Sequence, residues 1–271
     1  MKRNILITGV STGIGKSFIE LAASTYPDDT IIAFTRKPIT YAVSTNVFIY
    51  NVDISDLIAV EKLFKKVVRK HGDINILINN AGSGLVGTIE DTPIEQAKSQ
   101  FDLNVWAVIN LIQLVLPGMR NKKSGHIINI SSVAAEFDYP TMAYYGASKT
   151  LVEKISRILS TELQQWSINI SIIAPGTIKT KFGSHMTRFE GAKTSPYKKV
   201  YKHWSKNFAT MFTRHIVDSD QVAMQIIKTI DNPKAKAFVV MRDRMYTLLH
   251  KNSSNEFFTK HILNRYMSST K

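Results

Sequence analysis

The sequence predicts an α/β fold, a single doubly wound domain with a parallel sheet of about seven strands and helices on both faces. Three observations lead to this prediction. Short apolar runs alternate with segments of helical periodicity as far as about residue 240. The runs are continuously apolar, which is typical of parallel strands buried on both faces. No linker or internal repeat interrupts the chain, and 271 residues with 44% hydrophobic content suit one domain.

Each expected element follows from its own apolar pattern. The expected strands lie at residues 4–8, 30–34, 47–50, 74–78, 126–130, 169–173 and 237–240. A glycine-bearing turn at residues 9–15 leads into the first helix, and the later helices are expected at residues 55–71, 94–116, 144–163 and 220–230. The most apolar stretch, residues 105–116, is interrupted by Asn110 and Gln113 and closed by Pro117. It is shorter than the ~20 residues of a membrane-spanning helix, so we expect none.

Three groups of residues in this pattern suit ligand binding or catalysis. The glycines of Thr8-Gly9-x-x-x-Gly13-x-Gly15 permit a tight turn, and they let a pyrophosphate approach backbone N–H groups at a helix start. The segment Asn79-Asn80-Ala81-Gly82 follows a later strand, at the sheet edge where doubly wound folds bind ligands. Tyr145 and Lys149 share one helix face, where a cation lowers the pKa of a phenol and makes it a better acid or base. Each pattern alone is also compatible with a structural role.

Together these segments resemble the motifs of the classical short-chain dehydrogenase/reductase family. They occur in the family's order and spacing from residue 4 to about residue 183, with a weaker match through the last strand near residue 240. The matching segments are Thr8-Gly9-x-x-x-Gly13-Ile14-Gly15, Asn79-Asn80-Ala81-Gly82, Asn104, Ser131-Ser132, Tyr145-x-x-x-Lys149 and Pro175-Gly176-x-x-x-Thr180. The resemblance implies a Rossmann-type fold and hydride transfer with a nicotinamide cofactor.

The resemblance implies catalytic roles for four residues. Tyr145 would be the general acid in reduction and the base in oxidation. Lys149 would hold the nicotinamide ribose hydroxyls and lower the pKa of Tyr145. Ser132, thirteen residues before Tyr145, would hydrogen-bond the substrate carbonyl, with Ser131 as the adjacent alternative. Asn104 would steady a water through which the proton is relayed.

The resemblance also implies a set of cofactor contacts. Asp53 matches the acid that receives the adenine amino group, and Ile178 and Thr180 match positions near the nicotinamide carboxamide. Asp53 could instead cap the helix beginning near Ser55, and Asn80 could serve the fold more than the ligand. The expected cofactor residues are Gly9, Ser11, Thr12, Gly13, Ile14, Gly15, Arg36, Asp53, Ile54, Asn80, Ala81, Gly82, Tyr145, Lys149, Pro175, Gly176, Ile178 and Thr180.

The end of the second expected strand favours NADP(H) over NAD(H). Relatives specific for NAD usually place an acidic residue here to hold the ribose 2′-hydroxyl. This chain has Thr35 followed by Arg36 and Lys37, whose charges would favour a 2′-phosphate. A solvated basic loop is the alternative. Because the acid is absent and the cations are present, we expect NADP(H).

The last third of the chain resembles the family less closely. We expect residues 1–240 to form the catalytic domain, with a substrate lid around residues 180–215, and residues 241–271 to form a C-terminal extension. Aromatic residues and methionines in the lid suit either a pocket for an apolar substrate or packing of lid helices. The apolar extension resembles members acting on lipophilic alcohols and ketones, such as hydroxysteroid or retinol dehydrogenases.

The expected function is NADPH-dependent hydride transfer between the cofactor and a carbonyl or alcohol of a small lipophilic substrate. Reduction of a 3-oxoacyl thioester is one alternative, and a non-catalytic NADP-binding sensor is another. The complete set of catalytic residues argues against the sensor. Relatives commonly form homodimers or homotetramers through helices around residues 100–115 and 150–165.

The net charge of +14 is concentrated near the carboxyl end, since residues 188–271 hold 16 basic and 6 acidic residues. This favours anionic partners or only a solvated basic surface, and without a nucleic-acid motif we expect no nucleic-acid partner. The extension could contact an anionic membrane or pack on the domain or on a partner subunit. With no cysteine, thiolate metal sites are excluded and no metal is expected. No signal-peptide pattern is found, so the expected location is cytoplasmic, with peripheral membrane contact as the alternative.

Overall fold

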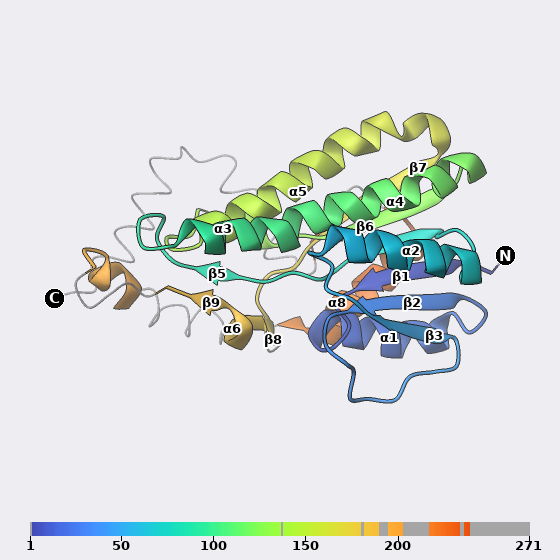
Figure 1. Ribbon diagram of the computed structural model, residues 1–271, viewed down its shortest axis with the longest axis horizontal. Coiled ribbons are helices and arrows are strands. Elements are labelled where there is room, and N and C mark those ends of the chain that lie inside the picture. Colours follow the sequence, from blue (N-terminus) through green and yellow to red (C-terminus); the bar gives the residue numbers. More distant parts are fainter. Residues whose placement is uncertain are drawn as a thin grey trace.

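The computed structural model describes residues 2–136, 138–179, 182–189, 195–202, 217–233 and 236–238. Within these ranges the chain forms a seven-stranded sheet in the order β11-β7-β6-β4-β1-β2-β3, and every neighbouring pair is parallel. Helices α2 to α5 lie on one side of the sheet and α1 and α8 on the other (Figure 1). The predicted α/β class and single Rossmann-type domain are confirmed.

Apart from the end of the last expected strand, which lies outside the described residues, the strands of the main sheet begin and end within two residues of the predicted bounds. They are β1 Asn4–Thr8, β2 Thr30–Thr35, β3 Val47–Asn51, β4 Ile76–Asn79, β6 Gly125–Ile130, β7 Ile168–Ala174 and β11 Lys236–Phe238. Two short parallel pairs were not predicted, because two-residue strands have no recognisable periodicity. They join β5 Leu85–Val86 to β9 Thr187–Arg188, and β8 Ile178–Lys179 to β10 Val217–Asp218.

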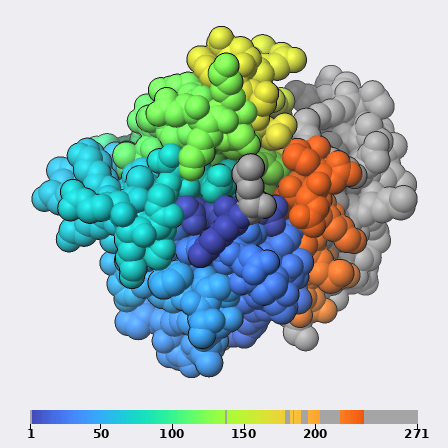
Figure 2. Space-filling view, turned by 90° about the vertical axis from the view of Figure 1, so that its right-hand side faces the viewer, coloured from blue at the N-terminus to red at the C-terminus, as the bar shows by residue number. Residues whose placement is uncertain are grey.

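The helices also follow the predicted order. They are α1 Gly13–Thr25, α2 Leu57–His71, α3 Ile94–Phe101, α4 Ala107–Lys122, α5 Ala143–Glu162, α6 Phe182–His185 and α8 Ser219–Asp231. A π-helical turn, η1 Asp102–Trp106, joins α3 to α4, and the 3₁₀ turns are η2 Val133–Ala135 and η3 Gln164–Trp166. Helix α8 packs against α1, so residues near positions 220 and 20 lie side by side (Figure 2).

The helix predicted at residues 94–116 differs from the observed one in its carboxyl end. Helix α4 continues through Pro117 to Lys122. Pro117 lies on the exposed side of the helix, where water can satisfy the Gln113 carbonyl that loses its intrahelical donor. Leu116 and Met119 meanwhile stay buried in the core.

This longer helix bears on the expectation about membrane spans. The continuous helical segment Ile94–Lys122 has 29 residues and a mean hydropathy of 1.4 in its best window, enough by length and composition to cross a membrane. A helix buried in a protein core meets the same test of length and composition, so the expectation that no helix spans a membrane is not overturned. In this fold the apolar residues of α4 pack on the sheet, which is how a core helix uses the same composition.

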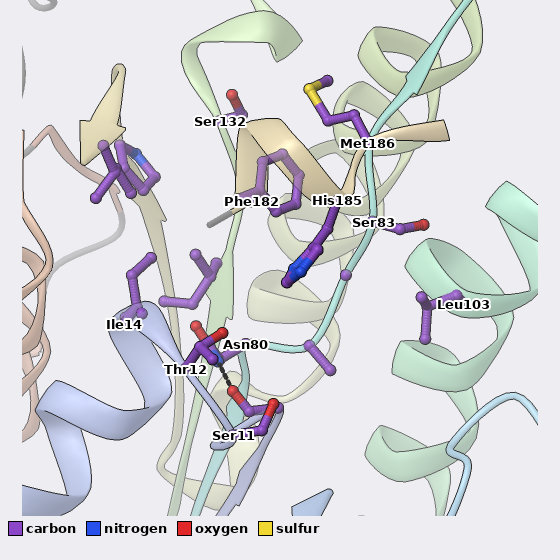
Figure 3. A pocket seen from close by; sticks show the side chains of 18 of the residues that line it. Ser11, Thr12, Ile14, Asn80, Ser83, Leu103, Ser132, Phe182, His185 and Met186 are labelled. Carbon is purple, nitrogen blue, oxygen red and sulfur yellow. Dashed lines mark hydrogen bonds between the residues drawn. The ribbon is translucent and has the colours of Figure 1, made fainter. Parts of the chain in front are cut away.

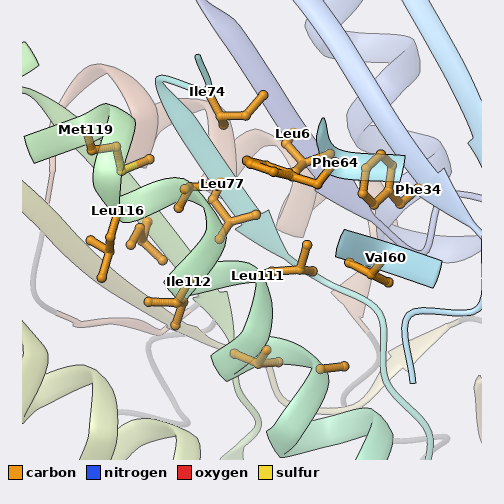
Figure 4. Close-up of a cluster of buried hydrophobic side chains, with 14 of the residues drawn as sticks. Leu6, Phe34, Val60, Phe64, Ile74, Leu77, Leu111, Ile112, Leu116 and Met119 are labelled. Atoms are coloured by element: carbon orange, nitrogen blue, oxygen red, sulfur yellow. The ribbon is translucent and has the colours of Figure 1, made fainter. Parts of the chain in front are cut away.

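Alternation along the strands divides the core into two clusters, one on each side of the sheet. Leu6 of β1 points into the cluster beneath α2, α4 and α5, whereas Ile5 and Ile7 point into the cluster beneath α1 and α8. Figure 4 shows the first cluster, in which Phe34 and Phe64 pack near Leu77. Because β1 connects toward β2 and β4 connects toward β6, the loops after β1 and β4 diverge and leave a crevice at the carboxyl edge of the sheet.

The remaining expectations about the carboxyl end lie outside the described residues. These are the C-terminal extension 241–271, the end of the last expected strand at 239–240 and most of the lid, at 190–194 and 203–216.

Candidate functional site

A cavity of about 760 Å³ lies at this carboxyl edge (Figure 3). Most of the predicted site residues line it, although they come from separate parts of the chain. They are Gly9, Ser11, Thr12, Gly13, Ile14, Arg36, Asp53, Ile54, Asn80, Ala81, Gly82, Ser132, Tyr145, Lys149, Pro175, Gly176 and Ile178. Gly15 and Asn104 do not line it, and Thr180 lies outside the described residues. We call the loops after β1, β2, β4 and β6, with the first turn of α1 and the face of α5 that carries Tyr145 and Lys149, the floor of the cavity. We call residues 182–189 its roof, together with the segment 195–202, which does not itself line the cavity.

The glycine turn leaves the start of α1 open to the cavity. Gly9 has φ +74° and Gly13 has φ +58°, a region that favours glycine. A Cβ on Gly15 would collide with the carbonyl oxygen of Gly9. Helix α1 has no capping side-chain hydrogen bond from Thr12 and no acid in its first turn. Its first backbone N–H groups can therefore donate hydrogen bonds to an anionic ligand such as a pyrophosphate.

Asn80 joins the loop after β4 to the turn after β1. Its amide Nδ2 donates to the carbonyl oxygens of Thr8 and Gly9, both at 2.9 Å. In return Thr8 Oγ1 accepts from the backbone N–H groups of Asn80 and Ala81. The side chain of Asn80 thus serves the fold, while the residue still borders the cavity.

Asp53 does not cap α2, so that alternative is wrong. The cap is Asp56, whose side chain accepts from the Ala59 N–H at 3.0 Å. Asp53 instead accepts from the N–H and hydroxyl of Ser55 and lies 3.5 Å from Nη1 of Arg36. Burial opposes its ionisation, but the hydrogen bonds from Ser55 and the charge of Arg36 outweigh it and hold the pKa of Asp53 below its usual value. An acid and a cation therefore face one end of the cavity.

Tyr145 and Lys149 lie one helical turn apart on the buried face of α5, each 7% exposed. Burial lowers the pKa of Lys149 to about 8, against the opposing charge of Glu153. Burial raises the pKa of Tyr145, and the hydrogen bond with Ser132 only partly offsets this. The expected lowering of the phenol pKa is thus not found, because burial dominates and Nζ of Lys149 donates to the Ile130 carbonyl at 2.9 Å.

The two adjacent serines have different surroundings. The hydroxyl of Ser131 is buried and donates to Oε1 of Glu153 at 2.7 Å. Ser132 lines the cavity beside Tyr145, and its Oγ also accepts from the Ala134 N–H at 3.1 Å (Figure 3). Ser131 also lines the cavity, but its hydroxyl is bonded to Glu153, so this geometry favours the expected assignment of Ser132.

Asn104 lies behind the cavity wall in the π-helical turn η1 and is 1% exposed. Its Oδ1 accepts from the Ser83 N–H, and its Nδ2 donates to the Ser83 carbonyl and to the Ser148 hydroxyl. Ser148 in turn donates to the Tyr145 carbonyl at 2.7 Å. The side chain of Asn104 therefore joins the loop after β4 to α5, the helix that carries Tyr145, by hydrogen bonds. The sequence pattern did not predict this role.

Residues of α6, and Met186 directly after it, cover the cavity opposite this floor. Phe182, His185 and Met186 point toward the cavity, and the ring of Phe182 lies 6.0 Å from that of Tyr145 (Figure 3). Met186 and Tyr145 belong to a small apolar cluster with Val86, Ala134 and Met142. The composition of the lid indicated apolar contacts but not which residues would make them.

Asp91 holds the roof to the loop after β5. Its Oδ2 accepts from the hydroxyls of Thr88, Ser195 and Tyr201 at 2.8–2.9 Å. The Tyr201 hydroxyl also accepts from the Thr88 N–H. Neither Asp91 nor Glu153 was predicted, although Glu153 stands four residues after Lys149 and its helix face could have been read from that spacing.

Comparison with known proteins identifies related chains along most of this length. A family model described as short chain dehydrogenase matches residues 3–191. An uncharacterized oxidoreductase of Schizosaccharomyces pombe is 33% identical over 238 residues, 86% of this chain and 80% of that one. A 3-ketodihydrosphingosine reductase of Bacteroides thetaiotaomicron is 33% identical over 178 residues, 66% of this chain and 65% of that one.

Solved structures share the fold at lower identity. A short-chain dehydrogenase from Streptomyces avermitilis superposes with a TM-score of 0.83 at 23% identity, covering 100% of this chain and 98% of that one. A serine dehydrogenase complexed with NADP⁺ gives 0.74 at 22% identity over 87% and 93% of the two chains. A short-chain dehydrogenase/reductase from Burkholderia phymatum in complex with NAD gives 0.78 at 19% identity, covering 92% of each chain.

No group of three or more potential metal-binding His, Asp or Glu side chains occurs in the described part of the chain. The floor instead combines an open helix start, a buried tyrosine–lysine pair and a serine around one cavity. The family model covers more than half of the chain, and the S. pombe oxidoreductase shares a third of its residues over most of both lengths. The chain therefore belongs to the short-chain dehydrogenase family and is an oxidoreductase.

Proposed function

We propose that this protein is an NADPH-dependent oxidoreductase that transfers hydride between the nicotinamide and a carbonyl or alcohol group of a small lipophilic substrate. One observation carries the proposal. Tyr145, Lys149 and Ser132 meet at the same cavity as the open amino terminus of α1. A proton donor, a cation and a hydroxyl are thereby placed beside a site suited to a pyrophosphate.

Each of these residues then has a distinct task. Bound cofactor supplies or accepts the hydride. The Ser132 hydroxyl donates to the substrate oxygen and orients it beside Tyr145. The phenol of Tyr145 gives its proton to that oxygen during reduction and recovers it during oxidation. Its raised pKa suits the protonated form required for reduction at neutral pH. Lys149 binds the ribose hydroxyls, and Asn104 keeps α5 in place against the loop after β4.

The preference for NADP(H) rests on the charges beside Thr35. Arg36 and Lys37 line the cavity, and Arg36 is 68% exposed, so its guanidinium can reach a 2′-phosphate. Asp53 offers that guanidinium a second partner and can hold it near the adenosine end. Some similar structures hold NADP⁺ or NADPH and another holds NAD, so the charges are the argument for this preference.

The proposal of a lipophilic substrate is based on the apolar wall beside Tyr145. Ala134, Met142 and Met186 form that wall with the tyrosine ring, and Val86 belongs to the same apolar cluster. A relative that bears the name of a 3-ketodihydrosphingosine reductase is consistent with a keto substrate. An apolar wall around one phenol and one hydroxyl binds a mostly hydrocarbon molecule by burial and orients its single oxygen.

The same proposal includes the arrangement of the whole chain. Residues 1–240 are the catalytic unit with Thr180 near the nicotinamide, residues 180–215 are its lid and residues 241–271 are an extension. The protein acts in the cytoplasm as a homodimer or homotetramer, for which exposed Trp106 and Ile158 provide contacts on the helices used by relatives. The basic extension either packs on the domain or touches an anionic membrane surface, and vesicle sedimentation with and without it distinguishes the two.

Replacement of Tyr145 tests the function directly. Tyr145→Phe removes only the proton donor, so turnover of an active carbonyl substrate should fall by about 10²–10⁴-fold while NADPH affinity stays near wild type. Lys149→Ala should impair both. Tyr144→Phe is the matched control, because it alters the adjacent phenol on the same helix. Nicotinamide absorbance with steroid, retinoid, aliphatic and 3-oxoacyl carbonyls gives the rates. Wild-type kcat in Tyr145→Phe would contradict the assignment.

A further inference from the structure

Glu153 is a buried acid next to the catalytic residues that the proposed proton transfer does not use. It lies on α5 one turn after Lys149, so both side chains occupy the same face of the helix. The residue is 2% exposed. Burying a carboxylate in this way is unfavourable unless charged or hydrogen-bonded groups compensate it.

The contacts of Glu153 join α5 to the end of β6. The hydroxyl of Ser131 donates to Oε1, and Nη1 of Arg157 lies 3.2 Å from Oε2. One turn earlier, Lys149 donates to the carbonyl of Ile130, the residue before Ser131. Two polar contacts a helical turn apart therefore hold the helix on the strand end that leads into Ser132.

The charge of Glu153 also acts on Lys149. Arg157 is 53% exposed, so solvent weakens its attraction for the carboxylate. From α5, Lys149 faces Tyr145 and Glu153, and from β6 it faces the Ile130 carbonyl. Burial lowers the pKa of the lysine to about 8, and the negative charge of Glu153 opposes that lowering. Without it the ammonium would lose its proton closer to neutral pH.

We infer that Glu153 is a positioning residue, which keeps Lys149 in its charged form and holds the end of β6 that carries Ser132. The inference rests on the proposed function, because Glu153 acts through Lys149. The carboxylate is the buried counter-ion that lets an ammonium remain inside the protein, where it can bind ribose hydroxyls.

The pH dependence of NADPH binding tests this role without any substrate. If bound cofactor prefers charged Lys149, wild-type affinity should fall as pH rises through about 8. Glu153→Gln keeps an oxygen for Ser131 but removes the charge, so the fall should move to lower pH by about one unit. Fluorescence titrations should then show nearly equal affinity at pH 6 and about fivefold weaker binding at pH 8. A uniform loss at every pH, or no shift, would make Glu153 structural only.

Three further variants separate the possible causes. Glu153→Asp keeps the charge and should retain the wild-type profile, and a profile equal to that of Glu153→Gln would overturn the inference. Lys149→Ala should remove the fall near pH 8, and Glu153→Gln in that background should add no pH dependence. If Lys149→Ala binds NADPH with the wild-type profile, the lysine role in the proposed function fails instead.

Arg157→Gln provides a test of opposite sign should thermal unfolding show that Glu153→Gln does not fold. It removes the exposed cation and leaves the buried carboxylate, so the fall in affinity should move to higher pH. An unchanged profile or a move to lower pH would overturn the inference.

Discussion

The floor and the roof of the cavity are held by different kinds of interaction. The floor consists of loops at the ends of parallel strands, joined by backbone contacts and by short side chains such as Thr8 and Asn80. The roof is attached by one two-residue strand pairing, between β5 and β9, and by side-chain hydrogen bonds, with Tyr201 bonded to Asp91 from 110 positions away. The floor therefore inherits the rigidity of the sheet, whereas the roof depends on a few exchangeable hydrogen bonds.

This difference suggests a division of labour. A rigid floor suits a cofactor with constant groups, and a separately attached roof can be altered to suit a particular substrate. Substitutions in the floor should change folding and cofactor binding, and substitutions in the roof should change substrate affinity.

The largest expected difference is between two glycines. A Cβ on Gly15 of the floor would collide with the carbonyl oxygen of Gly9, which the sheet holds in place. Gly15→Ala should reduce the free energy of unfolding by at least about 3 kcal/mol and abolish NADPH binding. A Cβ on Gly183 of the roof would meet no atom within 4 Å, so Gly183→Ala should stay within about 0.5 kcal/mol of wild type. Chemical denaturation and cofactor titration measure both, and equal effects would remove the contrast.

Acid should weaken the sheet before it affects the roof attachment. Burial lowers the pKa of His126 in β6 to about 4, so the folded protein favours its neutral form. The free energy of unfolding should be retained above pH 6.5 and fall between pH 6.5 and 4, by about 3 kcal/mol in total. His126→Gln should flatten this fall, and His185→Gln in the roof should leave it unchanged. Denaturation midpoints across this pH range measure the free energy of unfolding. If His126→Gln shows the same fall as wild type, the fall belongs to another titrating group.

The cofactor preference should respond only to the floor. Arg36→Ala should weaken NADPH binding by roughly 1–3 kcal/mol and leave NADH nearly unaffected, because a charged hydrogen bond to the 2′-phosphate is lost. Lys199→Ala removes an exposed roof cation and should alter neither affinity. Binding titrations with both cofactors decide this. Equal weakening of the two, or a wild-type preference for NADH, would refute the 2′-phosphate role.

The smallest effect is expected from loosening the roof. Asp91→Ala removes the acceptor of three hydroxyls, so amide hydrogen exchange in residues 195–202 should accelerate while exchange in β1 stays slow. The substrate KM should rise roughly three- to tenfold without a change in NADPH affinity. Tyr197→Phe removes one bond to Glu90 and should have a smaller effect. Weakened cofactor binding in Asp91→Ala would show that floor and roof are not independent.

The hydrogen bonds that Asp91 accepts in the roof should also persist at acidic pH. Hydrogen bonds from Ser195, Thr88 and Tyr201 hold the pKa of Asp91 below its usual value, against a partial opposing effect of burial. Its contribution is therefore present above about pH 3.8 and is lost only as pH falls further. Hydrogen exchange in the roof of wild type should stay slow through the range in which His126 destabilises the sheet.

The sequence predicted the floor well because its spacings are local. The strands, the glycine turn and the Tyr145–Lys149 pair follow from patterns of a few residues, and parallel strands bring their carboxyl ends to one edge. Pro117 within α4 was the exception, because whether a helix tolerates proline depends on which side faces water.

The tertiary structure alone decided what each polar side chain contacts. The sequence left Ser131 and Ser132 as alternatives, and the buried carboxylate of Glu153 distinguished them. It left a helix cap as the alternative to a cofactor role for Asp53, and Asp56 proved to fill the cap position. No sequence pattern predicted the hydrogen bonds that Asp91 accepts from residues more than a hundred positions away. Nor did any pattern predict which side of the cavity Phe182 and Met186 cover. Periodicity records which face of an element is buried, whereas hydrogen-bond partners are set by how separate elements pack, and that is fixed only once the chain has folded.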